Sequence, residues 1–432
     1  MPDAVAQNFS VSRPNPGKLY RWMVLVWVSL AMLGNYYVYD ALSPAADLLV
    51  NQLHFSDANI GLLQGIYSIP NIFTVVLGGV IIDRIGVKKS TFIFGMLCFA
   101  GAVITILSPR LAWMATGRLV FGMGAESLIV SITTLLAKWF RGKELSFAFG
   151  INLTIARLGS FAALNSPTWA RAAYGNWRYP FLIAVGFSIL CAVGPAIYWG
   201  MEDYALKHFA LAEGGAAEKV VFADLFNFGL SYWYIVGLCV VFYSAIFPFQ
   251  TFAVKFFQEA HGVSRETGGF LSSMLTLFAM IATPLFGLMV DKTGKRALFM
   301  SFGSVLLIPV FLMMAYSHVT LFLPMAIMGI AFSLIPAVMW PSVAYIVDEA
   351  KLGTAYGVMT MIQNIGLAGF NLLIGWANTY AGASAFNPGG YRLGMWIFSV
   401  LGFLGVAFAF LLRQREIGPD GHGLESITTQ KF

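Results

Sequence analysis

The most constraining feature of this sequence is a twelve-residue segment that occurs twice. GGVIIDRIGVKK at residues 78–89 returns as FGLMVDKTGKRA at residues 286–297. The matched positions share one offset of 208 residues (287 minus 79), and they pair Gly79, Asp83, Gly86 and Lys88 with Gly287, Asp291, Gly294 and Arg296. Because a chain of 432 residues repeats itself at about half its length, we expect two copies of one structural unit.

The composition is that of a membrane protein. Hydrophobic residues make up 58% of the chain and charged residues 11%, with a mean hydropathy of +0.75, whereas soluble domains carry about 45–50% and about 25%. A spanning helix needs about 20 mostly apolar residues. Twelve such stretches occur, six in each half: residues 22–44, 58–82, 88–107, 111–137, 144–167, 179–200, 231–257, 267–290, 297–317, 320–345, 353–378 and 392–412. The expected fold class is therefore an all-α membrane protein with twelve helices in two pseudo-symmetric six-helix bundles.

The placement of lysine and arginine predicts the topology, because cytoplasmic loops of membrane proteins are enriched in both. With the N terminus in the cytoplasm, 18 of the 26 basic residues fall on the cytoplasmic side, 5 on the opposite side and 3 within spans. This bias also explains the net charge of +6, so we do not expect nucleic-acid binding. The predicted parts are a cytoplasmic N-terminal tail (1–20), an N-terminal bundle (21–200), a cytoplasmic linker (201–230), a C-terminal bundle (231–412) and a cytoplasmic tail (413–432), which we expect to be mobile because it is rich in glycine and polar residues.

Each copy of the repeated segment lies between two apolar stretches, so it is predicted to form a tight cytoplasmic turn between two membrane helices. It resembles the signature loop of the major facilitator superfamily, which lies between helices 2 and 3 and between helices 8 and 9. Gly79 and Gly287 are expected to let helices approach closely, and Gly86 and Gly294 to permit the turn. The resemblance implies a transporter whose two halves hold a substrate near the midplane of the membrane.

The repeated aspartates are candidate gating residues, because a carboxylate can cap the N terminus of a helix. By symmetry, Asp83 is predicted to face the start of helix 11 near Gly353, and Asp291 the start of helix 5 near Lys143. In the superfamily this contact latches the outward-open state. The alternative is that these loops, with Arg84 and the other basic residues, only set the topology.

Glu126 and Arg157 are charges inside predicted spans, where a charge costs about 2.5–3.5 kcal/mol on insertion scales. Each lies fifteen residues from the turn at Arg141 and Gly142, which places both near mid-membrane on adjacent antiparallel helices. Such a pair can receive a zwitterion, with the glutamate taking an ammonium and the arginine binding a carboxylate. A structural ion pair between the two helices is the alternative.

Asp40 and Arg118 are a second pair of intramembrane charges at matching predicted depths. We expect them to pair with each other or to contact the substrate in the outer vestibule. Asp40 can alternatively act as a proton carrier, since a low-dielectric site raises the pKa of a carboxyl group. Tyr36 and Tyr37, on the same helix as Asp40, are candidates for lining a side-chain pocket.

The second half offers mostly neutral candidates, namely Tyr243, Gln250, Trp340 and Asn364 on helices 7, 10 and 11. Proline-weakened helices with aromatic and amide side chains suit a bending gate and a substrate pocket. Lys255 is expected near the outer boundary, with its ammonium reaching water. We find no convincing catalytic motif, no metal-ligand spacing and no phosphate-binding loop, so we expect neither an enzyme nor a resident cofactor or metal.

Residues 117–160 resemble one branch of the superfamily, the branch that contains the animal lysosomal dipeptide uniporter. The shared features are a glycine-rich helix with a glutamate, GRLVFGMGAE, the turn WFRGKEL and the segment ARLGS. NYYVYD at residues 35–40 and SIPNIF at residues 68–73 are also similar, so the detailed match covers about a quarter of the chain. The resemblance implies that Glu126 and Arg157 grip the charged ends of a dipeptide.

Other functions are alternatives to peptide transport. An oxalate–formate-like carboxylate exchanger would use the intramembrane basic residues but leave Glu126 unexplained. A drug exporter is disfavoured because helix 5, GINLTIARLGSFAALN, lacks the proline of that branch, and a non-transport sensor is disfavoured by two intact gate motifs. We expect a monomer in a bacterial inner membrane, and the sequence indicates no particular accessory subunit.

Overall fold

The structure is a computed structural model that describes residues 16–140, 144–209, 227–317, 319–348, 351–419 and 421–428. Within these helices, the side chains of residues 75, 76, 79, 80, 83 and 146 are not described. Eleven of the described segments are long and apolar enough to cross a membrane, and α3, with 29 residues, is a twelfth long helix. The predicted all-α membrane fold is confirmed.

Six long helices form each half of the molecule. The first half contains α1 (Lys18–Asp40), α3 (Asp57–Ile85), α4 (Val87–Leu107), α5 (Leu111–Phe140), α6 (Leu145–Leu164) and α8 (Arg178–His208). The second half contains α9 (Leu230–His261), α10 (Arg265–Thr293), α11 (Arg296–Tyr316), α12 (Phe322–Ile346), α13 (Leu352–Tyr380) and α14 (Arg392–Ile417). Short helical segments join some of them, namely α2 (Ala46–Leu53), α7 (Ser166–Trp169) and the 3-10 turns Ser43–Ala45, Arg171–Gly175 and Pro388–Tyr391.

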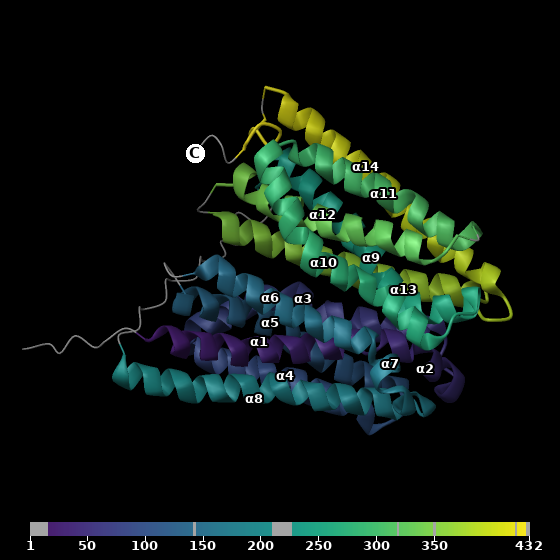
Figure 1. Cartoon of the computed structure of the whole chain (residues 1–432), viewed down its shortest axis with the longest axis horizontal. Helices are drawn as coiled ribbons and strands as arrows, with labels where there is room; N and C mark the ends of the chain where they lie inside the picture. The colour runs from purple at the N-terminus through teal and green to yellow at the C-terminus, as the bar shows by residue number, and fades with distance from the viewer. Residues whose placement is uncertain are drawn as a thin grey trace, which may run out of the picture.

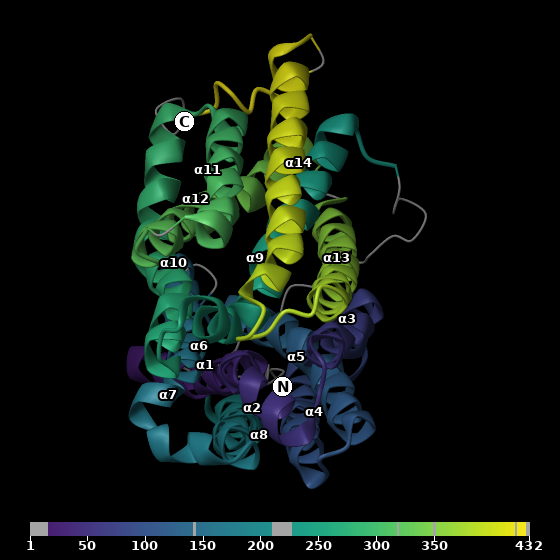
Figure 2. The same ribbon diagram turned by 90° about the vertical axis from the view of Figure 1, so that its right-hand side faces the viewer.

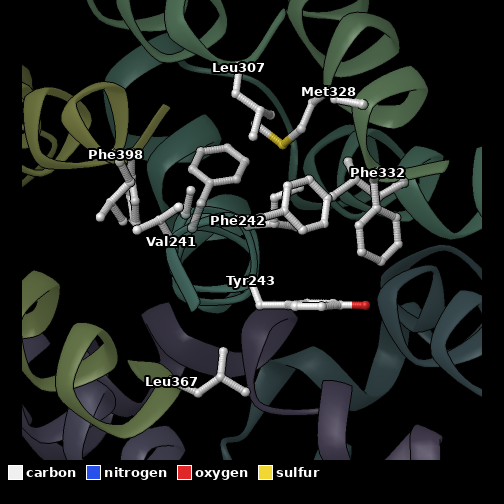
Figure 3. Packing of buried hydrophobic residues seen from close by; sticks show 14 of the residues in the cluster. Val241, Phe242, Tyr243, Leu307, Met328, Phe332, Leu367 and Phe398 are labelled. Carbon is white, nitrogen blue, oxygen red and sulfur yellow. The ribbon is translucent and has the colours of Figure 1, made fainter. Parts of the chain in front are cut away.

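The first half has an apolar core of its own, whereas the core of the second half continues across the interface to Leu49, Ile60 and Met114 of the first half. In the first half α1 packs on α6 and α8, and α5 packs on α3 and α4; in the second half α9 packs on α13 and α14, and α12 on α10 and α11. The two bundles lie one above the other in both views (Figures 1 and 2). Figure 3 shows Phe242 of α9 pointing toward Phe332 of its own bundle, with the Tyr243 ring next to it on the side that faces the first half.

The two halves touch most closely at the end of the molecule opposite the chain termini (Figure 1). Gly61 of α3 lies against α13 so tightly that a Cβ atom there would be 2.3 Å from the carbonyl oxygen of Asn371. At the other end, a Cβ atom on Gly287 would meet no atom within 4 Å. With the termini on the predicted cytoplasmic side, the end where the two halves pack tightly is the outer end.

Ion pairs reinforce the closed end. Lys255 of α9 binds Asp57 of α3, with 2.9 Å between Nζ and Oδ1, so a buried pair joins the two halves. The Lys255 ammonium also donates to Glu259 at 2.9 Å and to the Tyr391 hydroxyl at 2.8 Å. Lys255 is 2% exposed. The expectation that it reaches water was therefore wrong, because its N–H groups bind Glu259 on the same helix and two acceptors, Asp57 and Tyr391, from distant parts of the chain.

The linker and the C-terminal tail also differ from expectation. α8 continues to His208, so residues 201–208 of the predicted linker are helical, and residues 210–226 lie outside the described residues. The part of the tail that the structure describes is packed, with Leu424 fully buried. The expectation of mobility was wrong for this segment, because an apolar side chain and a carboxylate in it find binding partners on the second half.

Candidate functional site

A cavity of about 250 Å³ lies between the two halves. The first half contributes Asn35, Tyr36, Tyr39, Asp40, Tyr67, Glu126, Ile129, Arg157 and Ser160. The second half contributes Tyr243, Phe247, Gln250, Thr276, Phe332, Trp340, Thr360, Gln363, Asn364 and Leu367. All three charged residues of the lining come from the first half, so the cavity has a charged wall facing a neutral one.

Glu126 on α5 and Arg157 on α6 face this cavity together. Glu126 accepts a hydrogen bond from the Tyr67 hydroxyl at 3.3 Å. The Arg157 guanidinium lies between two aromatic rings, 5.4 Å from the Tyr36 ring centre and 5.6 Å from that of Phe332, which belongs to the second half. The ion pairs of the described residues do not include one between Glu126 and Arg157, so both charges are available to a ligand in this conformation.

Asp40 lines the cavity, but Arg118 does not. Arg118 is 3% exposed and donates to the carbonyl oxygens of Val38 at 3.1 Å and Tyr39 at 3.4 Å, both in the last turn of α1. It also donates to the Leu63 carbonyl and the Gln64 amide oxygen. The last carbonyls of a helix lack helical partners and favour a cation.

The predicted pair between Asp40 and Arg118 is absent from the ion pairs that the described residues form, and this interpretation was wrong. The guanidinium instead caps α1, which fixes the end of the helix that carries Asp40.

The aromatic and amide candidates also divide into residues that line the cavity and one residue that does not. Tyr36, Tyr243, Gln250, Trp340 and Asn364 all line the cavity. Tyr37 does not, because its ring stacks on Phe187 with 3.9 Å between centroids inside the first half. The prediction that Tyr37 lines a substrate pocket was therefore wrong.

Several lining residues were missed from the sequence, although helical spacing could have found some of them. Asn35 and Tyr39 are four residues apart on α1, and Thr360, Gln363 and Leu367 repeat at three and four residues on α13. A stripe of this kind lies on one face of a helix. Tyr67 and Phe332 carry no such signal and required the structure.

The Major Facilitator Superfamily profile matches residues 28–258 and 236–428, which together cover nearly the whole chain. The chain belongs to the major facilitator superfamily. Its relatives include the lysosomal dipeptide transporter MFSD1 of Homo sapiens, which is 32% identical over 385 residues that cover 84% of this chain and 81% of the relative. The same transporter of Bos taurus is 34% identical over 379 residues, covering 82% of this chain and 79% of the relative. The similarity thus extends well beyond the quarter of the chain that carries the recognisable motifs.

Other relatives and solved structures agree on the fold. The hexuronate transporter of Bacillus subtilis is 23% identical over 389 residues, covering 83% of this chain and 89% of the relative. A bacterial homologue of the human lysosomal transporter Spinster, solved in an inward-facing and unoccupied conformation, superimposes with a TM-score of 0.72 at 18% identity. That match covers 92% of this chain and 98% of the other. The superfamily is one of transporters, not a class of enzymes.

The superfamily loop of the second half is visible in detail. Gly294 has a φ of 66° and its counterpart Gly86 a φ of 82°, values that favour glycine. Asp291 binds Arg296 of its own loop at 2.9 Å in this conformation. The Arg296 guanidinium also lies 4.6 Å from the Tyr345 ring centre and donates to the carbonyl of Ile427 at 2.7 Å.

The equivalent loop of the first half is less completely described. Gly79 and Asp83 lie on α3, but the surroundings of Gly79 and the side chain of Asp83 are outside the described part of the structure, as is the whole of Lys143. Lys88 binds Asp203 of α8, and Arg84 is exposed. The gating role of these residues stays a prediction, because the latch is expected only when this end of the molecule closes.

The C-terminal tail forms a strap over the second loop, which we define as residues 421–428. The Glu425 side chain accepts from the backbone N–H of Ala297 at 2.8 Å, and its carbonyl accepts from the N–H of Lys295 at 3.1 Å. The strap therefore caps the N terminus of α11 at the superfamily loop, which satisfies backbone donors that have no helical partner. Glu416 anchors the strap by accepting from the His422 N–H at 2.8 Å.

Proposed function

We propose that this protein transports dipeptides or other short peptides by alternating access between its two halves. The amino end of the peptide binds Glu126 and its carboxylate binds Arg157. The observation that carries this proposal is the arrangement of these two opposite charges on one cavity without a mutual ion pair.

The chemistry of the cavity supports a zwitterionic substrate. Separated charges that face one buried space bind a ligand whose own charges are separated. The aromatic groups of Tyr36, Tyr243 and Trp340 offer apolar walls for side chains, and small-molecule sites commonly combine such walls with a few placed polar groups. The relatives named as dipeptide transporters support the same substrate class.

The conformational cycle follows from the two ends of the interface. In the described state the buried pair of Lys255 and Asp57 closes the outer end. Opening that end breaks this pair, and closing the inner end brings Asp83 and Asp291 toward the starts of α13 and α6. We propose this cycle for a monomer in a bacterial inner membrane with both termini cytoplasmic, supported by the excess of basic residues on that side.

An organic-anion transporter is the second candidate. Relatives named as hexuronate and galacturonate transporters favour it, and Arg157 offers a cation for a carboxylate. Asp40 and Glu126 oppose it, because they place two acidic side chains on the cavity that the anion would have to enter.

The test is a thermal-shift screen of the purified protein against dipeptides, free amino acids, dicarboxylates and hexuronates. A ligand at 100 times its dissociation constant stabilises a protein by about 2.7 kcal/mol. Stabilisation by dipeptides is expected in the wild type and is expected to disappear in Glu126→Gln and in Arg157→Gln. Arg110→Gln, an exposed residue outside the cavity, is the matched control and should respond like the wild type.

Two outcomes contradict the peptide proposal. Stabilisation by hexuronates or dicarboxylates that is lost in Arg157→Gln but kept in Glu126→Gln indicates the organic-anion transporter. A dipeptide response that survives in both cavity variants shows that these charges do not hold the substrate.

A further inference from the structure

Two buried amide oxygens on the cavity lining have no hydrogen-bond partner among the described residues. They are Oδ1 of Asn35 on α1 and Oδ1 of Asn364 on α13, in side chains that are 3% and 2% exposed. Buried polar atoms are nearly always paired, so each such atom needs an explanation.

The local hydrogen bonds show which atom of each side-chain amide has no hydrogen-bond partner. Asn364 Nδ2 donates to the carbonyl oxygen of Thr360 at 3.0 Å, and Asn35 Nδ2 donates to that of Ala125 at 3.4 Å. Only the amino group of an amide can donate to a carbonyl. The free atom is therefore an acceptor in both cases, and the missing partner must supply an N–H or O–H.

Ser160 Oγ on the same lining is also buried without a partner among the described residues, but it belongs to a hydroxyl group, which can donate as well as accept. Trp340 donates to the Tyr243 hydroxyl at 2.9 Å, and the Gln363 side-chain oxygen accepts from the Cys239 thiol at 3.7 Å. Gln363 is next to Asn364 in the sequence and lines the same cavity. Among the described amide side chains of the lining, a buried oxygen without a partner is thus found at these two positions.

The two positions lie on different halves of the protein. Asn35 is bonded to the backbone beside Glu126, where the proposed function places the ammonium group of the peptide. Asn364 lies on the neutral wall of the second half, away from the three charged residues of the lining. A free amino acid and a dipeptide both carry an ammonium and a carboxylate, and the peptide N–H is the donor that only the dipeptide has.

We propose that the Asn364 side chain turns its buried Oδ1 toward the substrate to accept the peptide N–H, and thereby selects peptides over free amino acids. This inference rests on the proposed function. The first half holds the charged ends, and Asn364 gives the second half its own contact with the substrate. A ligand that makes both contacts joins the halves, whereas a free amino acid binds the first half alone.

The experiment removes the N–H from the ligand without changing its charged ends. L-alanyl-L-alanine and its ester isostere L-alanyl-L-lactate differ only in N–H against oxygen at the central bond. We expect the wild type to bind the dipeptide about tenfold more tightly than the ester, because one hydrogen bond to a buried acceptor changes the affinity by about that factor. In Asn364→Leu the two ligands should bind with nearly equal affinity, because the acceptor is gone.

Gln363→Leu is the matched control, since its oxygen is already bonded, and it should keep the tenfold preference. If Asn364→Leu prefers the dipeptide over the ester by the same factor as the wild type, the inference is overturned while peptide transport is left intact. Failure of the wild type to bind either ligand overturns the proposed function itself, and the inference with it. Asn364→Ala serves as a second variant if the leucine substitution does not fold, and the same retained preference overturns the inference.

Discussion

At the scale of single residues, two intramembrane arginines of the first half have opposite environments. Arg118 is 3% exposed and surrounded by carbonyl and amide oxygens, so its charge is used within the fold. Arg157 faces the cavity between two aromatic rings and has no described ion pair. A charge within a membrane helix can therefore be either a structural cap or a candidate binding group, and the partners and exposure of the side chain separate the two.

Replacing Arg118 by lysine tests its structural role. Lysine keeps the charge but lacks the planar fork that bonds to several acceptors at once. Each lost hydrogen bond to a charged group is worth about 1.5–3 kcal/mol, so we expect the free energy of unfolding to fall by at least about 2 kcal/mol. Thermal unfolding in detergent should show this loss while dipeptide affinity stays within about twofold of the wild type. An unchanged unfolding temperature with lost binding would instead place Arg118 at the substrate.

At this scale the sequence predicts which charged residues lie within the membrane helices, but not which residues they bind. The shared depth of Glu126 and Arg157 follows from equal distances to one turn, and the structure places both on one cavity. The partners of Lys255 could not be predicted, because Asp57 and Tyr391 are 198 and 136 residues away in the sequence (255 minus 57, 391 minus 255). Such long-range pairs depend on how the helices pack, which hydrophobic periodicity does not encode.

At the scale of helices, the contact between α3 and α13 depends on the absence of a side chain at Gly61. The twelve spans were predictable because each is a long apolar run, and the structure finds a long helix at each position. Which helices face one another across the two halves was predictable only near the repeated loops. The close approach at Gly61 does have a signal in the sequence, because Gly61 and Gly65 form a G-x-x-x-G pattern and both lie against α13. The pattern does not indicate which helix is the partner.

Substituting alanine at Gly61 should hinder closure of the outer end. The added Cβ atom would lie 2.3 Å from a backbone oxygen of α13, so the two helices must separate. We expect a larger outward-open population, seen as faster labelling from outside of a cysteine placed at Thr276 in the cavity. Gly369→Ala on α13 is the matched control because a Cβ atom there meets nothing within 4 Å. Equal labelling rates in the two variants would show that the alanine side chain at position 61 fits between α3 and α13 without separating the two helices.

At the scale of the whole molecule, ion pairs of very different burial join the halves at the outer end. Asp57 and Lys255 have side chains that are 4% and 2% exposed, whereas the Arg171 side chain, paired with Glu266, is 84% exposed. Breaking a buried pair by removing one partner costs about 3–5 kcal/mol, while exposed pairs contribute about 0–1 kcal/mol. The buried pair is therefore expected to contribute more to outer closure than the exposed pair.

Lys255→Met should shift the conformational equilibrium toward the outward-open state. The variant leaves Asp57 and Glu259 buried without their cation, and opening the outer end lets water reach them. Because 1.4 kcal/mol is a factor of ten in an equilibrium constant, a shift of at least tenfold is expected. Distances between spin labels on the outer ends of the two halves measure it. Arg171→Ala should leave those distances unchanged, and a similar response in both variants would contradict the ranking by burial.

The strap at residues 421–428 has a consequence for biosynthesis. Chains emerge from the ribosome N terminus first, so Leu424 and Glu425 are made after every membrane helix. Until they appear, the start of α11 lacks the acceptor that Glu425 supplies to Ala297, and Arg296 lacks the carbonyl of Ile427. The loop between α10 and α11 is therefore among the last parts of the second half to acquire native contacts during translation. A nascent chain halted at Ile417 has all twelve spans, but the start of α11 is not yet capped.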